Sequence, residues 1–193
     1  MGDREVRVEE CTLCGQVLVH PEDAERVLSE RGPVDVPPLD AREVVLALLG
    51  GHPERPVYNR IVLMKETFLF EKELAREMEV PVSSLRFVPY KYGPYSKMVD
   101  DALRELEVRG LVRIDRVSAG QKEVIELTEA GAEEARTALD RLTEEQRHRL
   151  ERKRKAWDQL GYRGLLEKVY EEYPAYKTRS EIADKVKPRR RWT

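Results

Sequence analysis

The stretch Lys91-Tyr-Gly-Pro-Tyr-Ser96 and the residues that follow it to Leu127 decide the fold. Glycine followed by proline predicts a rigid turn, and apolar residues at helical spacing after it predict a helix that ends at Arg109-Gly110. Glycine favours this end because it adopts the left-handed conformation that follows many helices. Two short strand-like segments, joined by Ser-Ala-Gly-Gln at 118–121, then predict a β-hairpin.

Two further helices are predicted upstream of this turn. Asp40 is a typical N-cap for a helix that runs through an apolar stretch and stops at Gly50-Gly51. Residues 60–78 place apolar side chains at helical spacing and predict a buried second helix. Three helices followed by a hairpin are the order of a winged helix-turn-helix, in which the segment Tyr95–Arg109 takes the position of the recognition helix.

The C-terminal third is predicted to be helical. Thr128 begins one helix, and a Thr-Glu-Glu-Gln capping box at 143–146 begins the next, which ends before Gly161. A last short helix stops at Pro174. We therefore predict a mainly α fold with a small β-hairpin. It comprises a CxxC knuckle and helix in residues 1–38, a winged helix-turn-helix in 39–128, and a helical extension with a basic tail in 129–193.

The charges of the chain nearly cancel, but they are unevenly distributed. Of the 193 residues, 37% are charged and the formal net charge is -2, while 40% are apolar, which suffices for a folded core. Residues 1–56 carry 6 bases and 12 acids, residues 57–146 carry 14 and 18, and residues 147–193 carry 15 and 7. No apolar run reaches the ~20 residues of a membrane helix, and the residues after Met1 lack signal-peptide character. We therefore expect a soluble, cytoplasmic protein.

The basic last quarter suggests an electrostatic contact. Its partner could be nucleic acid, an acidic protein surface or the chain's own N-terminal half, and the alternative is a solvated helix laced with salt bridges. The outward positions of the predicted recognition helix include Lys97, Asp100, Asp101, Arg104, Glu105 and Glu107. So many carboxylates would repel DNA, so we assign nucleic-acid contact to the C-terminal part. The candidate nucleic-acid-binding residues are Arg147, Arg149, Arg152, Lys153, Arg154, Lys155, Lys187, Arg189, Arg190 and Arg191.

Cys11 and Cys14 form a CxxC pair between two strand-like segments, which is half of a zinc ribbon. Structural zinc takes four ligands, and the chain has no other CxxC pair. The site would be completed by His20 and His52, or by the same cysteines of a second subunit, which would make a zinc-bridged homodimer. A redox role would need a thioredoxin-like βαβ context, which is absent, and the remaining interpretation is two reduced cysteines in a loop. The candidate metal ligands are Cys11, Cys14 and His20.

Aromatic residues surround the central turn. Phe87, Tyr90, Tyr92 and Tyr95 could form a stacking platform, but such residues more often fix a turn against a core, and we favour that structural role. Catalytic motifs do not stand out, since the chain has no glycine-rich phosphate loop, nucleophile elbow or HExxH. Its carboxylates lie in helical surface patterns beside bases, so we predict that the protein is not an enzyme.

Several stretches resemble a known family. They are Arg60-Ile-Val-Leu-Met-Lys-Glu-Thr-Phe68, Phe87-Val-Pro-Tyr-Lys-Tyr-Gly-Pro-Tyr-Ser96, Leu103-Arg-Glu-Leu-Glu-Val-Arg-Gly-Leu-Val112 and residues 165–180. Over roughly residues 40–182 the chain resembles the YwgA-like family, which is related more distantly to the Panacea, or SocA-type, antitoxin domains. This resemblance implies a winged-helix fold in a prokaryotic protein linked to regulation, toxin neutralisation or genome defence.

Together these observations predict a non-enzymatic winged-helix regulator or defence-linked accessory factor. It would associate with nucleic acid through its basic C-terminal part, with no membrane partner. The alternative is an antitoxin-like or adaptor protein that acts by protein contact through the acidic winged helix.

Overall fold

The computed structural model describes residues 8–10, 17–19, 37–117 and 122–186 of a chain that divides into two compact units, Met1–Pro37 and Pro38–Thr193. In the first unit, β1 (Val8–Glu10) pairs antiparallel with β2 (Val17–Val19), and Glu10 lies opposite Val17. The CxxC pair between these strands and the helix predicted after them lie outside the described residues.

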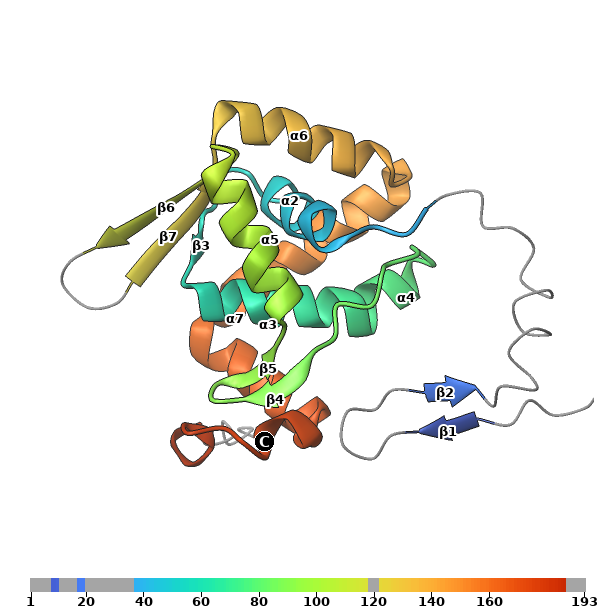
Figure 1. Ribbon diagram of the computed structural model, residues 1–193, viewed down its shortest axis with the longest axis vertical. Helices are drawn as coiled ribbons and strands as arrows, with labels where there is room; N and C mark the ends of the chain where they lie inside the picture. The colour runs from blue at the N-terminus through green and yellow to red at the C-terminus, as the bar shows by residue number, and fades with distance from the viewer. Residues whose placement is uncertain (1–7, 11–16, 20–36, 118–121, 187–193) are drawn as a thin grey trace, which may run out of the picture. The chain divides into compact units, whose positions relative to one another are not determined.

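The second unit is mostly helical and contains small antiparallel sheets, which confirms the mainly α prediction (Figure 1). Its central element is α2 (Ala41–Gly50), which begins and ends where the sequence predicts. The Asp40 carboxylate accepts from the backbone N–H groups of Arg42 and Glu43, and Glu43 accepts from the Asp40 N–H, so the two residues form a capping box. All residues from Val44 to Leu49 are buried because α2 packs against helices on several sides.

The segment predicted as a buried helix over 60–78 is a continuous helical rod with a π-helical turn in it. Its parts are α3 (Arg60–Leu69), the π-helical η1 (Phe70–Leu74) and α4 (Ala75–Glu77). Everything from Val62 to Phe70 is buried, including Lys65 and Glu66. Phe68 makes edge-on contacts with Phe87, Tyr173 and Tyr176, with ring centroids 5.1, 4.8 and 4.7 Å away. The rod is therefore buried on all its faces between Val62 and Phe70.

The central turn is itself a small hairpin, which the sequence analysis did not predict. β4 (Val88–Tyr90) pairs antiparallel with β5 (Gly93–Tyr95), and α5 (Lys97–Val108) follows. Ser96 joins the two because its hydroxyl donates to the Leu85 carbonyl and accepts from the Val99 N–H as the N-cap of α5. The helix ends before Gly110, whose φ is 69°.

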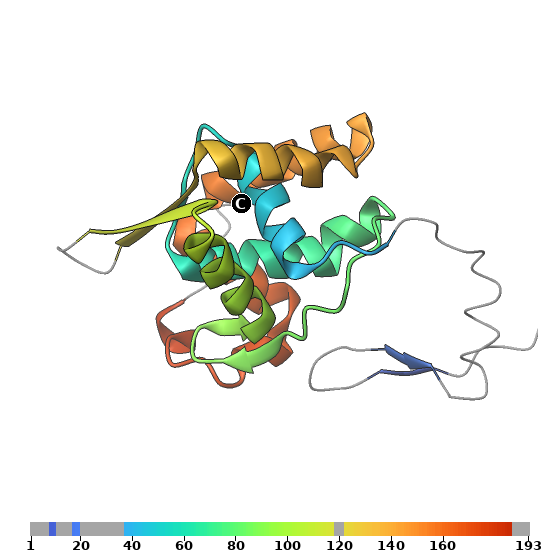
Figure 2. The same cartoon turned by 45° about the horizontal axis from the view of Figure 1, so that its top comes forward.

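The predicted C-terminal hairpin is confirmed. β6 (Val112–Val117) pairs antiparallel with β7 (Lys122–Leu127), and the short β3 (Val57–Tyr58) joins β7 on its other edge. The strand order is β3-β7-β6. Figures 1 and 2 show β6 and β7 projecting from the helical body as an arm.

The helices after the hairpin complete the same compact unit. They are α6 (Glu129–Asp140), α7 (Glu144–Glu172, kinked at Gly161) and the 3₁₀ turns η2 (Pro174–Lys177) and η3 (Ala183–Lys185). α6 packs on α2, and α7 packs on α3. A Cβ at Gly131 would lie 1.7 Å from the Leu111 carbonyl oxygen, so only glycine permits this approach of α6 to the hairpin. Among the helices of the described residues, none combines the length and apolarity that a bilayer crossing requires.

Candidate functional site

The predicted nucleic-acid-binding residues of α7 are divided between the surface and the core. The exposed or half-buried ones are Arg147, Arg149, Arg152, Lys153 and Lys155. Arg154 is completely buried, and the prediction is wrong for this residue because its side chain points at α3 instead of solvent. Lys187, Arg189, Arg190 and Arg191 lie outside the described residues.

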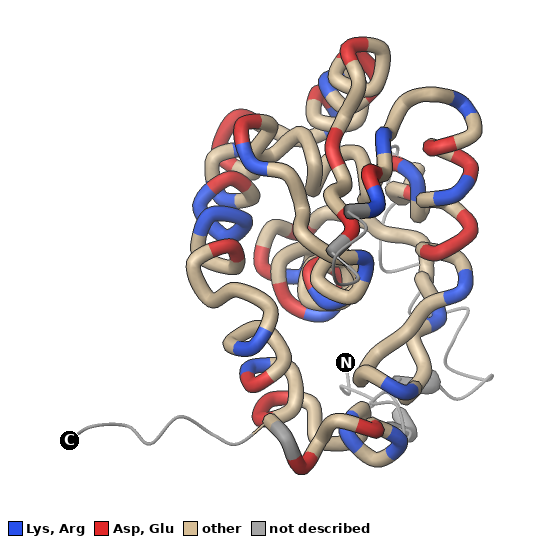
Figure 3. The backbone as a smooth tube through the Cα atoms, turned by 90° about the vertical axis from the view of Figure 1, so that its left-hand side faces the viewer, with Lys and Arg blue, Asp and Glu red and all other residues tan. Residues whose placement is uncertain are grey.

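Carboxylates neutralise most of the exposed bases of α7. The pairs are Arg147 with Asp140 at 2.9 Å, Lys153 with Glu77 at 3.2 Å, Arg149 with Glu145 at 4.0 Å, and Lys155 with Glu151 at 2.5 Å. Figure 3 shows the same interleaving of basic and acidic residues along the helices. A phosphate group would compete with these carboxylates for each base, which weakens the case for a nucleic-acid surface here.

Arg154 instead links α7 to α3 inside the core. Its Nε lies 3.3 Å from Glu66 Oε2, and its Nη1 pairs with Asp158 one turn further along α7. Burial raises the pKa of Glu66, and the positive charge of Arg154 opposes that rise. This internal ion cluster holds the two longest helical segments together.

The outward face predicted for the recognition helix also needs one correction. Asp100 of α5 is buried, because it pairs with Arg60 at 2.7 Å and with Arg104 at 2.9 Å. The exposed Lys97 pairs with Asp101 at 2.6 Å. The charges of α5 are thus compensated within the protein.

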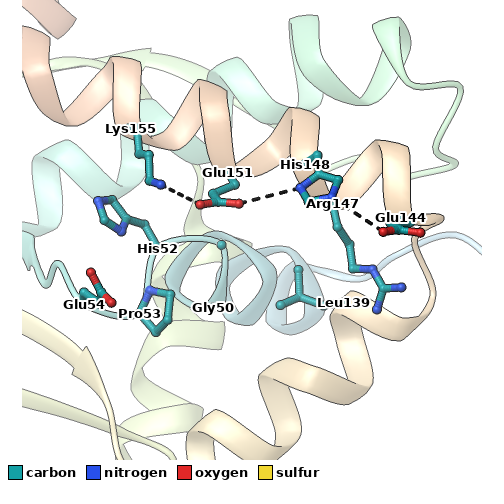
Figure 4. Close-up of a pocket in the computed structure, with 11 residues that line it drawn as sticks. Gly50, His52, Pro53, Glu54, Leu139, Glu144, Arg147, His148, Glu151 and Lys155 are labelled. Carbon is teal, nitrogen blue, oxygen red and sulfur yellow. Dashed lines mark hydrogen bonds and ion pairs between the residues drawn. The ribbon is translucent and has the colours of Figure 1, made fainter.

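A cavity of about 550 Å³, with several charged side chains in its lining, lies between the end of α2 and the start of α7 (Figure 4). His148 contacts two carboxylates, with Nε2 3.7 Å from Glu144 and Nδ1 3.9 Å from Glu151, and Lys155 also bonds Glu151. His52, which the sequence analysis considered as a zinc ligand, lines the same cavity. In the part of the chain that the structure describes, no group of three or more His, Cys, Asp or Glu residues is arranged to hold a metal ion. Cys11, Cys14 and His20 lie outside that part.

A second, apolar cavity of about 170 Å³ lies where α3 meets the β4–β5 hairpin. We call it the tyrosine groove. It is lined by Arg60, Ile61, Met64, Lys65, Tyr90, Tyr92, Gly93, Pro94 and Tyr95. Tyr90 is 47% and Tyr92 39% exposed, and the rings of Tyr90 and Tyr95 pack against each other with centroids 5.1 Å apart. The structural role that we predicted for these tyrosines therefore describes only part of what they do, since two of them also present aromatic surface to solvent.

The hairpin is fixed over the groove by close contacts on its inner side. Gly93 has a φ of 88°, and a Cβ there would lie 2.9 Å from Tyr170 Cε1 and 3.4 Å from Lys65 Cε. The hydroxyls of Tyr170 and Ser180 are 2.6 Å apart. The Lys91 carbonyl accepts from the backbone N–H of Glu181 at 2.9 Å, so the C-terminal segment also holds the hairpin tip.

Lys65 lies at the inner end of the tyrosine groove. It is 3% exposed, and its Nζ donates to the Pro94 carbonyl oxygen at 2.8 Å. Burial lowers the pKa of Lys65 to about 7. Within the described residues, no carboxylate forms an ion pair with it.

Comparison with known families supports one of the predicted relationships. A model of the family described as "Antitoxin SocA-like, Panacea domain" matches residues 63–193. The chain belongs to this family. The predicted relationship to the Panacea domains is thus confirmed, and the finer YwgA-like assignment stays a prediction. No curated protein matches the chain.

The Panacea match begins inside α3 and includes the β4–β5 hairpin and all of α7. It therefore contains most of the tyrosine groove, and it leaves out the CxxC segment. Lys65 is not among the site residues predicted from the sequence. A signal was present, because Lys65-Glu66 interrupts the apolar run from Ile61 to Leu69, and charges in a buried helix need a specific reason.

Proposed function

We propose that this Panacea protein is antitoxin-like and acts by protein–protein contact through the tyrosine groove. The observation that carries the proposal is the family match over residues 63–193, which spans the hairpin and most of the groove lining. Exposed tyrosines beside a small apolar depression are typical of the anchor points of protein interfaces.

The charge arrangement supports a protein partner over nucleic acid. The exposed bases of α7 are largely paired with carboxylates, and the groove contains aromatic and apolar surface instead of a cluster of free cations. Affinity for nucleic acid depends on bases that are free to neutralise phosphates. Affinity for a protein depends on a few buried aromatic anchors, which Tyr90 and Tyr92 can supply.

The proposal is tested by neutralisation of toxins in cells. The chain is co-expressed with each member of a panel of bacterial toxins from toxin–antitoxin pairs, and colony formation is counted. We expect wild type to restore growth against at least one toxin and the Tyr90→Ala/Tyr92→Ala variant to lose that rescue. Val108→Ala is the matched control, since Val108 is an exposed apolar residue at the far end of α5. Rescue that survives the double tyrosine variant would contradict the assignment of the groove.

We further propose that α2, α3, α5 and the β6–β7 hairpin form a winged helix, which the strand order β3-β7-β6 supports.

A second candidate function, association with nucleic acid, is favoured by the 15 bases against 7 acids in residues 147–193. An anisotropy titration with duplex DNA, single-stranded DNA and RNA tests it. If ~5 phosphates are neutralised, the log of the affinity falls against log salt with a slope near -4.5. Absence of binding at low salt would remove this candidate.

Two further proposals concern catalysis and a metal site. We propose that the protein binds and does not catalyse, and the mutual pairing of the polar groups in Figure 4 supports this because it leaves few of them free to act on a substrate. We also propose a zinc ion at Cys11 and Cys14, with either of the two completions predicted from the sequence. The zinc site is tested by metal analysis of wild type and Cys14→Ser, both purified without chelator. Wild-type protein that contains no zinc would contradict the site.

A further inference from the structure

Among the described residues, every buried charge but one has an opposite charge beside it. Among the described residues the buried charged side chains are Lys65, Glu66, Asp100, Arg154 and Glu167. Glu66 pairs with Arg154, Asp100 with Arg60, and Glu167 with Arg163 at 3.1 Å. Lys65 has no such partner in the described chain. Its one hydrogen bond, to the Pro94 carbonyl, uses one of the three hydrogens that an ammonium group can donate.

An unpaired buried amine is costly, and a methionine of similar length would fill the same space without that cost. Packing alone therefore does not account for lysine at this position. Lys65 lies in the wall of the tyrosine groove, next to the space that a ligand would occupy. The other cation of the groove, Arg60, already pairs with Asp100 at 2.7 Å and with Glu123 at 3.5 Å. An anion that enters the groove thus finds a single unpaired cation.

We propose that the tyrosine groove binds an acidic–apolar segment of a partner protein, whose carboxylate pairs with Lys65 while a neighbouring apolar side chain packs against Tyr90, Tyr92 and Pro94. The inference rests on the proposed antitoxin-like function and specifies the chemistry that its binding site recognises. Charge complementarity selects the carboxylate, and the apolar lining selects the side chain next to it.

The size and donors of the groove favour a carboxylate over a phosphate. Phosphate sites usually combine several donors, most often arginine forks or rows of backbone N–H groups, and the groove supplies one amine. Its volume of about 170 Å³ is below the roughly 300–1,000 Å³ of pockets for drug-sized ligands and suits one or two side chains. Tyr90 and Tyr95 already pack on each other, which reduces the flat aromatic surface open to a nucleic-acid base.

Binding should depend on pH in a defined direction. The titratable and charged groups around Lys65 in the wall of the groove are Arg60 on its own helix, the phenols of Tyr90, Tyr92 and Tyr95 in the hairpin, and Tyr170 of α7. None of these ordinarily changes charge near neutral pH. Because the pKa of Lys65 is lowered to about 7, the free protein loses this positive charge above neutral pH. A bound carboxylate favours the charged amine, so affinity is highest between about pH 5 and 7 and falls as the pH rises toward 9.

The test uses a phage-displayed library of random linear peptides, panned on the full chain at pH 6.5. We expect selected peptides to contain an Asp or Glu next to an apolar residue. The best peptide is then synthesised with its Glu or Asp, and again with Gln or Asn, and affinities are measured by fluorescence anisotropy. Removing the carboxylate should weaken binding to wild type about tenfold to a hundredfold, the range for a hydrogen-bonded charge pair.

Lys65→Met should weaken binding of the acidic peptide by the same factor and abolish the difference between the acidic and amide peptides. Lys97→Met is the control, since Lys97 is an exposed lysine outside the groove that pairs with Asp101. The comparison of the acidic peptide with the amide peptide uses wild-type protein alone, so the proposal stays testable if Lys65→Met folds poorly. Selection of peptides without acids, no selection at all, or an unchanged affinity for Lys65→Met would overturn the proposal. So would competition by oligo(dT), which would assign the groove to nucleic acid.

The toxin panel separates failure of this inference from failure of the proposed function. If Lys65→Met rescues growth as well as wild type while Tyr90→Ala/Tyr92→Ala does not, the groove binds a partner but does not recognise a carboxylate through Lys65. If both variants rescue as wild type does, the groove itself is wrong.

Discussion

Two adjacent residues of α3, Lys65 and Glu66, are both buried and have opposite surroundings. Glu66 faces α7, where Arg154 and Asp158 complete a buried ion cluster. Lys65 faces the β4–β5 hairpin, where it meets a carbonyl oxygen and an apolar cavity. Both charges cost free energy to bury, but among the described residues only Glu66 has an opposite charge beside it. The comparison separates a charge that holds the fold from a charge that is placed for a partner.

Removal of Arg154 should give the largest effect. Arg154→Met leaves Glu66 buried without its cation, and breaking a buried pair in this way costs about 3–5 kcal/mol of unfolding free energy. Urea unfolding followed by circular dichroism measures it. The Glu66→Gln/Arg154→Met double variant should lose less than the two single variants together, because it leaves no lone glutamate. Additive losses would mean that the two side chains do not interact.

Gly93→Ala should disturb the Lys65 side by a smaller amount. The new Cβ would lie 2.9 Å from Tyr170, at a φ of 88° that alanine rarely adopts, and we expect a loss of about 1–3 kcal/mol. Gly110→Ala is a matched control, since Gly110 has a φ of 69° but nothing lies within 4 Å of its added Cβ. The difference between the two variants isolates the packing of the hairpin on Tyr170. Equal losses would show that backbone strain alone accounts for the effect.

The pH dependence of stability should distinguish Lys65 from an ordinary lysine. Its pKa is about 7 in the folded protein and near 10.5 when unfolded, so the unfolded chain binds more protons between these values. Stability from this group therefore rises with pH across that window, by at most about 1.4 kcal/mol per pH unit. Lys65→Met should lack this increment when urea unfolding is compared at pH 7 and 9. A parallel pH dependence in both proteins would mean that Lys65 keeps an ordinary pKa.

The sequence predicted the elements well and the burial of charges poorly. Caps and breakers are local signals, which is why Asp40, Gly50 and the capping box at 143–146 located helix ends. The β4–β5 pairing and the π turn depend on tertiary contacts and were not predicted. Arg154 belongs to the run Arg152-Lys-Arg-Lys155, and composition does not distinguish its members. Helical spacing does, since Leu150 and Trp157 lie on the same buried face as Arg154.

The neighbours of Arg154 provide the smallest effect and the sharpest contrast. Lys153 and Lys155 pair with Glu77 and Glu151 at the surface, where an exposed ion pair contributes about 0–1 kcal/mol. Lys153→Met and Lys155→Met should therefore change unfolding free energy by less than about 1 kcal/mol, and 0.5 M NaCl should reduce even that difference because salt screens exposed pairs. A loss as large as that of Arg154→Met would contradict the division of this basic run into one structural residue and a solvated face. Because both lysines lie outside the tyrosine groove, neither change should alter affinity for the acidic peptide.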